Sequence, residues 1–200
     1  MTVDRKTIGV YDAQAMDYAT RFDSSGKPGK HLRRFMDAVR PGGDILDLGC
    51  GPAGAAKHMI TEGFVVDAVD ASAEMVRVAA EVNGVQARVA TFDDINEVAA
   101  FDGVWANFSL LHAPSASLPS YLSAIAKALR SGGIFHIGMK VGSGAARDGI
   151  DRLYTYVERD ELADLLRDAG FTVVATDDGA DVGLAGTEDP WVVMMACKDG

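Results

Sequence analysis

A short segment near residue 50 carries residue types whose spacing could bind a charged ligand. An apolar strand at 44–48 carries an acidic residue, Asp47, near its end and leads directly into a turn formed by Gly49, Cys50 and Gly51. Because glycine has no side chain, the chain can turn tightly here and a ligand can lie against the backbone. Asp47 places a carboxylate in the same crevice. The segment therefore favours a nucleoside that carries a positive group.

S-adenosylmethionine is such a nucleoside, with an ammonium and a sulfonium. A nicotinamide dinucleotide is the alternative, because residues 49–54 match the pattern G-x-G-x-x-G. Pyrophosphate binding uses free backbone N–H groups at a helix start, and Pro52 has none. Asp47 would also repel a diphosphate. We expect Asp47 to attract the ammonium, directly or through water; the alternative is that it only caps backbone N–H groups of the turn.

Acidic residues after the next two strands extend this site. Asp70 ends the second strand, 21 residues beyond Gly49, a spacing at which a carboxylate can accept both ribose hydroxyls. Capping of the following helix is the alternative role for Asp70. After the third strand, Asp93 is expected to accept from the adenine amino group while Phe92 or Ile95 covers the ring. Further cofactor contacts are predicted at Tyr11, Tyr18, Cys50, Ala71, Asp94, Asn107 and Ser109.

Three later residues are candidates for the second substrate, the methyl acceptor. Methyl transfer from a sulfonium is an in-line displacement, in which the protein chiefly aligns the nucleophile. His112 could act as a base or orient the acceptor; packing in the turn before Pro114 is the alternative. Lys140 and Arg147 could clamp an anionic acceptor, although Arg147 could equally be a solvated loop charge. Ser109 could contact either substrate.

The surrounding pattern alternates strands with amphipathic helices, which predicts a mostly parallel sheet covered on both faces. Helices are expected at 11–22, 31–39, 53–62, 118–129 and 159–169. A further helix, with Ser72 as its N-cap, is expected to hold Met75, Val76 and Ala79. Strands are expected at 44–48, 64–69, 85–91, 103–108, 134–139, 171–176 and 191–197. The Gly-rich segment 141–152 is interpreted as a long loop. We expect one domain over 1–200, with lid helices in 1–40 and a Rossmann-like core in 44–200.

The charge and composition of the chain limit the classes of partner that it can bind. The 200 residues carry a net charge of −10, and the basic residues are dispersed, which disfavours nucleic acid as a substrate. No apolar run reaches the length of about 20 residues that crosses a bilayer, and the polar start shows no signal peptide. Two cysteines give neither a disulfide framework nor a metal site. A cytoplasmic location, no metal and no membrane partner are expected; the oligomeric state is open.

The order of these motifs resembles class I S-adenosylmethionine-dependent methyltransferases over nearly the whole chain. The matching segments are I-L-D-L-G-C-G-P (45–52), V-D-A-V-D-A-S (66–72), T-F-D-D (91–94), F-D-G-V-W-A-N (101–107) and L-R-S-G-G-I (129–134). The resemblance implies an α/β, Rossmann-like, doubly wound sheet of seven strands, mostly parallel, with an antiparallel last strand and helices on both faces. It also implies cofactor binding by Gly49, Gly51, Asp70 and Asp93. Many members have glycine where this chain has Ala53, so we expect a slightly shifted helix start.

Within that family, the segment 105–112 and the Lys-containing loop after it are similar to a bacterial small-molecule branch. This branch includes tellurite-resistance-type and uncharacterised methyltransferases. The N-P-P-Y or D-P-P-Y motif of amino-methylating DNA enzymes is replaced here by Asn107-Phe108-Ser109-Leu110. The first hypothesis is therefore methyl transfer to a small molecule. A nicotinamide-dependent oxidoreductase and a non-catalytic S-adenosylmethionine-binding protein are the alternatives.

Overall fold

The computed structural model describes residues 4–21, 26–183 and 185–200. The α-helices are α1 (Arg5–Arg21), α2 (Lys30–Ala38), α3 (Gly54–Thr61), α4 (Ala73–Val78), α5 (Leu118–Ala128) and α6 (Arg159–Asp168). The strands are β1 (Asp44–Leu48), β2 (Val65–Asp70), β3 (Arg88–Val89), β4 (Phe101–Asn107), β5 (Leu129–Val141), β6 (Ala145–Arg147), β7 (Leu153–Val157), β8 (Phe171–Val182) and β9 (Glu188–Lys198). The first helix begins six residues before its predicted start, and its predicted end, Phe22, lies outside the described residues.

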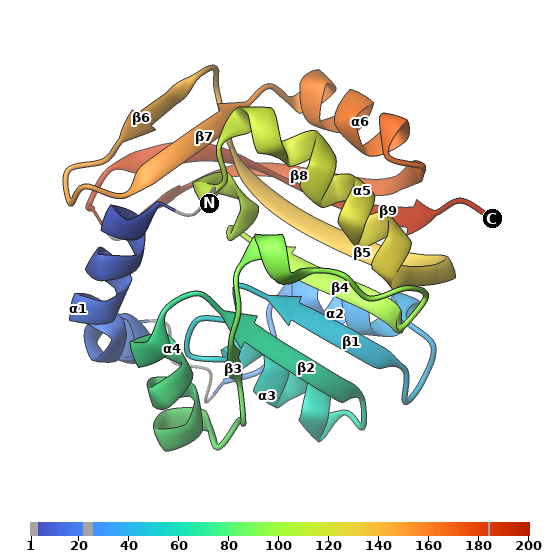
Figure 1. Cartoon of the computed structure of the whole chain (residues 1–200), viewed down its shortest axis with the longest axis horizontal. Coiled ribbons are helices and arrows are strands. Elements are labelled where there is room, and N and C mark those ends of the chain that lie inside the picture. Colours follow the sequence, from blue (N-terminus) through green and yellow to red (C-terminus); the bar gives the residue numbers. More distant parts are fainter. Residues whose placement is uncertain (1–3, 22–25, 184) are drawn as a thin grey trace.

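Seven strands form the main sheet in the order β3-β2-β1-β4-β5-β9-β8 (Figure 1). The neighbours from β3 to β5 are parallel, whereas β9 is antiparallel to both β5 and β8. The antiparallel last strand between its neighbours confirms the predicted Rossmann-like sheet. Strand order reverses between β1 and β4, and open α/β sheets bind their ligands at the carboxyl ends of the strands beside such a reversal.

The predicted loop at 141–152 is wrong in part, because it contains β6. This short strand is antiparallel to β7, and β7 pairs parallel with the end of β5 through Lys140 and Tyr156. All three residues of β6 are exposed, so the strand carries no alternation of buried and exposed side chains that a sequence pattern could reveal. The acidic segment after residue 176 is likewise strand, as an exposed extension of the β8–β9 pair.

Helices cover both faces of the sheet. Leu122 and Ile125 of α5 and Leu162 of α6 belong to the larger hydrophobic core. On the other face, α2 and α3 pack with Ile45 and Trp105 in a second core. Helix α1 stands apart from both cores and packs along α4 at one edge of the molecule (Figure 1). This arrangement leaves α1 beside the carboxyl ends of the central strands.

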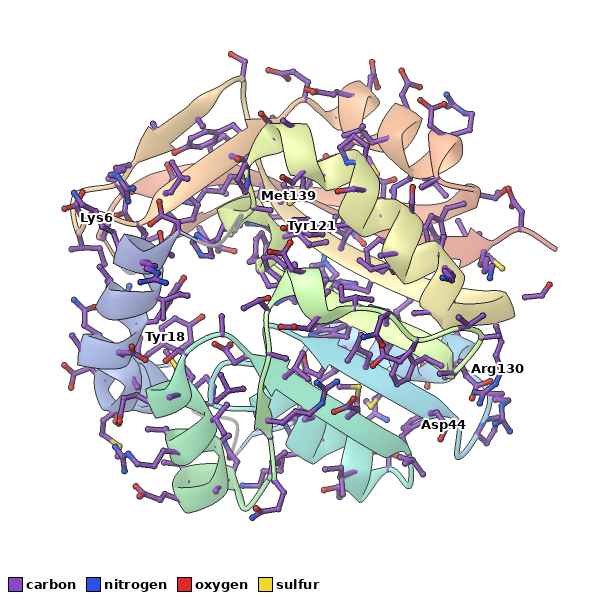
Figure 2. The ribbon with its side chains drawn as sticks, viewed as in Figure 1. Lys6, Tyr18, Asp44, Tyr121, Arg130 and Met139 are labelled. Atoms are coloured by element: carbon purple, nitrogen blue, oxygen red, sulfur yellow. The ribbon has the colours of Figure 1, made fainter. Side chains whose placement is uncertain are left out.

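A cluster of charged side chains lies at the amino ends of the central strands, opposite the ends that face α1. The buried carboxylate of Asp102 accepts from Arg40 Nε and Arg130 Nη1, each at 2.7 Å, and from the backbone N–H of Asp44 at 2.9 Å. Arg130 also pairs with the Asp44 carboxylate at 3.0 Å. Figure 2 shows Asp44 and Arg130 together, on the far side of the molecule from Tyr18 of α1. Asp102 thus fixes the amino ends of β1 and β4, away from the candidate site.

Candidate functional site

A cavity of about 500 Å³ lies at the carboxyl ends of β1, β2, β4 and β5. Helix α1 lines it with Thr7, Ile8, Tyr11 and Tyr18, whereas none of its described lining residues comes from α2. Of the predicted residues, it is lined by Tyr11, Tyr18, Asp47, Gly49, Cys50, Gly51, Asp70, Ala71, Phe92, Asn107, Ser109, His112 and Lys140. Asp93, Asp94 and Arg147 are not among its lining residues.

The backbone N–H groups of the glycine turn are already bonded within the protein. Gly49 and Cys50 both donate to the carbonyl of Val69, at 2.8 and 2.9 Å. Gly51 donates to Asp70 Oδ2 at 2.8 Å, and Ala53 donates to the carbonyl of Cys50 at 2.9 Å. Pro52 has no N–H to offer. The segment 49–53 therefore has no N–H group left for a pyrophosphate, which supports the choice of an adenosyl ligand over a dinucleotide.

Gly49 is required by its contact with Ser109. Its φ of 75° lies in the left-handed region, and a Cβ built on it would lie 2.4 Å from Ser109 Cβ. Ser109 is held at this place because its hydroxyl donates to the carbonyl of Leu48 at 2.6 Å. The next helix, α3, begins at Gly54, one residue later than predicted, after Ala53 in a left-handed conformation. The backbone of Gly49, after the end of β1, thereby packs directly against the side chain of Ser109, after β4.

Asp47 is buried at the end of β1, with 2% of its surface exposed. Its Oδ2 has no hydrogen-bond partner among the described residues, although the pocket lies beside it. Burial, followed by the negative charge of Asp70, raises the pKa of Asp47 to about 7. A buried carboxylate oxygen without a partner is costly, so the site favours a ligand that brings a hydrogen-bond donor or a positive charge.

Asp70 lies across the turn from Asp47, at the end of β2. Its Oδ2 accepts from Gly51 and its Oδ1 accepts from the backbone N–H of Ser72 at 2.8 Å. Burial nevertheless raises the pKa of this carboxyl. The N-cap of α4 is Ser72, whose hydroxyl accepts from the N–H of Met75 at 3.0 Å, as predicted. Asp70 therefore stabilises the turn and still faces the pocket, with lone pairs beyond the two in use.

The predicted adenine side of the site is a single-turn 3₁₀-helix at 92–94. Phe92 lines the pocket beside Ala90 and Thr91. Asp93 is exposed, and its Oδ1 accepts from the hydroxyl of Tyr121 at 2.7 Å. Asp94 accepts from the N–H and the hydroxyl of Thr91, both at 2.8 Å, and so caps this short helix. The structure thus brings Phe92 into the pocket wall and gives both aspartates structural partners.

The end of β4 and the segment after it line the pocket with Asn107 and Phe108. Asn107 Oδ1 lies 3.0 Å from Nε2 of the buried His136, whose ring stacks on Trp105. Phe108 follows with a φ of 57°, which is strained for a bulky residue and is found mostly where a site constrains the chain. The contact with His136 fixes the Asn107 side chain, which lines the pocket.

His112 lies further along the segment after β4 and makes two hydrogen bonds. Its Nε2 lies 2.8 Å from the hydroxyl of Tyr11 on α1, and its Nδ1 lies 2.7 Å from the carbonyl of Leu153 on β7. Desolvation by burial lowers the pKa of His112 to about 4. The imidazole is therefore neutral near pH 7. His112 also lines the pocket, and its predicted role as a base or in orienting the acceptor stays a prediction.

Lys140 and Arg147 are not brought together. Lys140 lines the pocket, pairs with Asp189 at 2.5 Å and lies 3.8 Å above the ring of Tyr154. Arg147 instead pairs with Asp4 at 2.6 Å, at the start of α1. The two cations thus lie in different surroundings, and each already has a carboxylate partner.

Arg152 is one of the pocket residues that the sequence analysis missed. It is buried, with 3% exposure, and its Nε and Nη2 donate to Asp148 Oδ2 at 2.9 and 2.8 Å. Its Nη1 donates to the hydroxyl of Tyr11 at 3.1 Å. The sequence signal that could have found it is the pair of opposite charges Asp148 and Arg152, four residues apart and directly before β7. Tyr154 and Trp191 also line the pocket, and with Tyr11 and Phe108 they form what we call its aromatic end.

Comparisons with known proteins give one partial family match. Residues 45–133 match the family model of a methyltransferase domain, which spans β1 to the first part of β5. No curated protein sequence matches the chain. Within the described residues, no helix combines the length and the apolar character needed to span a membrane.

Several solved structures are similar in fold. The 1,6-didemethyltoxoflavin-N1-methyltransferase of Burkholderia thailandensis, solved with 1,6-didemethyltoxoflavin and S-adenosylhomocysteine, is 24% identical, with a TM-score of 0.74 over 98% of this chain and 88% of that one. A SAM-dependent methyltransferase from Methanosarcina mazei is 16% identical, with a TM-score of 0.72 over 87% and 99%. The [4+2]-cyclase SpnF is 16% identical, with a TM-score of 0.70 over 96% and 94%. These structures share the fold, and the cyclase shows that the fold alone does not fix the reaction.

The family match supplies what the fold alone does not. It covers the strand with Asp47, the glycine turn, Asp70 and the segment after β4, all of which line the pocket. Residues 45–133 thus match a methyltransferase domain, and the sheet around them has the fold of solved S-adenosylmethionine-dependent methyltransferases.

Proposed function

We propose that this enzyme transfers a methyl group from S-adenosylmethionine to a small, flat and uncharged acceptor. The observation that carries the proposal is that one cavity of about 500 Å³ joins a carboxylate-lined end to an aromatic end. A volume of this size is in the range of small-molecule sites. Both reactants can therefore meet within one cavity, as an in-line displacement requires.

The carboxylate end suits the cofactor. Neither Asp47 nor Asp70 takes part in an ion pair with a described Lys or Arg, so a cationic ligand would supply the missing partner. We assign Asp47 to the ammonium and Asp70 to the ribose hydroxyls, with Gly49 and Gly51 beneath the ligand. When bound, the cofactor supplies a methyl group on a sulfonium, which is a good leaving group.

Side chains around this end would hold the rest of the cofactor. Phe92 and Ala71 would cover the adenine and the ribose, and Asp93 remains our candidate for the adenine amino group. Tyr18 lines the pocket from α1 and lies 3.9 Å from the place of a Cβ on Gly51. We assign Tyr18 to closing the cofactor from above, as part of a lid formed by α1. Cys50, Asn107 and Ser109, which line the pocket, remain our candidates for further cofactor contacts, whereas Asp94 lies outside the pocket lining.

The aromatic end favours a flat, uncharged acceptor. Rings of Tyr11, Phe108, Tyr154 and Trp191 line it, and flat rings bind well against such walls. Its two cations, Lys140 and Arg152, are each paired with a carboxylate, so an anionic acceptor would have to compete with Asp189 and Asp148. For this reason we favour a neutral ring over the anion that the sequence suggested for Lys140 and Arg147.

Labelled transfer tests this function. The purified full chain is incubated with S-adenosylmethionine carrying a tritiated methyl group, together with a cell extract separated into small molecules, proteins and nucleic acids. We expect label in the small-molecule fraction, in a compound that absorbs in the near ultraviolet. Label confined to protein or nucleic acid would overturn the acceptor class, and no label in any fraction would overturn catalysis of methyl transfer.

A matched pair of variants controls this experiment. Asp47→Asn removes the proposed partner of the ammonium and is expected to abolish most labelling. Asp37→Asn changes an exposed carboxylate on α2, outside the pocket, and is expected to label as the wild type does. Equal loss in both variants would show that the effect does not come from the pocket.

A further inference from the structure

We propose that Tyr11 and His112 together take a proton from the acceptor, which therefore carries an N–H or O–H at the atom that is methylated. The inference rests on the proposed function, because it concerns the acceptor end of the same pocket. It assigns Tyr11, expected from the sequence to contact the cofactor, a role in the chemistry.

The hydrogen bonds of His112 fix its tautomer. Nδ1 lies 2.7 Å from the carbonyl oxygen of Leu153, which can only accept, so Nδ1 carries the hydrogen. In a neutral imidazole the other nitrogen then has a lone pair and no hydrogen. Nε2 is therefore the acceptor in its 2.8 Å contact with Tyr11, and the Tyr11 hydroxyl is the donor.

The hydroxyl of Tyr11 is held from a second side. Arg152 Nη1 donates to the same oxygen at 3.1 Å, while Nε and Nη2 of Arg152 are fixed on Asp148. The oxygen thus gives its hydrogen to His112 and uses one lone pair for Arg152. Its second lone pair is left for a hydrogen bond from a ligand, and Tyr11 lines the pocket.

Charged and titratable groups face His112 from several parts of the fold. Tyr11 faces it from α1, Asp148 and Arg152 from the segment before β7, Tyr154 from β7, and Lys140 from β5. Arg152 and Lys140 act in the same direction as burial and disfavour the imidazolium, while Asp148 opposes them. His112 is consequently an unprotonated base near neutral pH.

The proposed step balances in atoms and charge. The lone pair of the acceptor atom forms a bond to the methyl carbon, and the carbon–sulfur bond breaks with its electron pair on sulfur. The proton of the acceptor atom passes to the oxygen of Tyr11 while the Tyr11 hydrogen passes to His112 Nε2. Tyr11 ends neutral and His112 ends as imidazolium. The positive charge lost at sulfur reappears at His112, so the net charge of the pocket does not change.

Nitrogen NMR tests the arrangement without knowledge of the acceptor. The full chain, labelled with ¹⁵N-histidine and saturated with S-adenosylhomocysteine, is compared with Tyr11→Phe and Tyr156→Phe, and His112→Gln identifies the resonances. We expect a protonated Nδ1 and a hydrogen-bonded, unprotonated Nε2 in the wild type. Tyr11→Phe should move the Nε2 resonance to the position of a nitrogen without a hydrogen bond, whereas Tyr156→Phe, outside the pocket lining, should leave it in place. A proton on Nε2, or an Nε2 resonance that Tyr11→Phe does not move, would overturn the proposal.

Kinetics provide a second readout, with the small-molecule fraction that the wild type labels as acceptor. At saturating cofactor, Tyr11→Phe is expected to slow single-turnover transfer by about 100-fold or more, as loss of acid–base assistance does. Unchanged transfer by Tyr11→Phe in a protein that binds S-adenosylhomocysteine would overturn the proton transfer alone. Failure of the wild type to bind S-adenosylhomocysteine would overturn the proposed function instead.

Discussion

The carboxylates of Asp47 and Asp70 face one pocket from the ends of two neighbouring parallel strands. The charge of Asp70 adds to burial in raising the pKa of Asp47 to about 7. A buried acid such as Asp47 beside a half-buried one such as Asp70 destabilises a protein unless a cation or protons accompany them. The pair therefore costs stability in the free protein and becomes favourable when a cationic ligand binds.

The first prediction concerns the pH dependence of the free protein. Because the folded state raises the pKa of Asp47 from its ordinary value of 3.8 to about 7, the folded state holds more protons than the unfolded state between these values. Stability due to Asp47 is thus lost as pH rises from 4 to 7, by up to about 4 kcal/mol. Urea unfolding of the free protein at several pH values should show that Asp47→Asn is the more stable protein at pH 8, and that its advantage shrinks toward pH 4.

Comparison with the variant is needed because His112 and His136 titrate in the opposite sense. Burial lowers the pKa of both, so their contribution to stability is lost as pH falls. The difference between wild type and Asp47→Asn removes that contribution, and the difference for Asp37→Asn serves as reference. A wild type that is as stable as Asp47→Asn at pH 8 would contradict the burial of an unpaired carboxylate.

The second prediction separates contact from backbone strain at the glycine turn. Gly49 and Gly132 have nearly equal φ values of 75° and 74°, but only Gly49 has a neighbour, Ser109, where a Cβ would lie. Gly132→Ala should cost about 1–2 kcal/mol for the left-handed conformation. Gly49→Ala should cost about 1–3 kcal/mol more, because of overpacking. Unfolding in urea measures both; equal losses would show that the turn can move away from Ser109.

The third prediction compares two arginines of the same segment. Arg152→Met leaves the buried Asp148 without its partner and should destabilise the protein by about 3–5 kcal/mol. Arg147→Met breaks the more exposed pair with Asp4 and should cost about 1 kcal/mol or less. The double variant Arg152→Met with Asp148→Asn should recover part of the larger loss in the same urea experiment. If Arg147→Met proved the more harmful change, the assignment of Arg152 as the buried anchor of Tyr11 would be wrong.

Much of the fold could be predicted because its strands are buried and its helices amphipathic. Strand β1 was predicted with its observed limits, and the antiparallel last strand follows from the family pattern. The hairpin of β6 and β7 could not be predicted, since β6 is exposed along its whole length. Its pairing depends on the end of β5, which is far away in sequence.

The candidate site also has a part that could be predicted from the sequence and a part that could not. The residues beside the glycine turn are local in sequence, so Asp47, Gly49, Gly51 and Asp70 could be placed together from spacing alone. The contacts of Tyr11 with His112 and Arg152 join α1 to segments 101 and 141 residues away. No local pattern records such distances, which is why Arg147 was chosen where Arg152 lines the pocket.

Calorimetry with S-adenosylhomocysteine is the most direct test of the account. The full chain at pH 8 is titrated with S-adenosylhomocysteine and, separately, with NADH. We predict saturable binding of one S-adenosylhomocysteine per chain, loss of at least about tenfold in affinity for Asp47→Asn, an amount that corresponds to about 1.4 kcal/mol, and no binding of NADH. Saturation by NADH without heat from S-adenosylhomocysteine would contradict a pocket built for a cationic adenosyl donor.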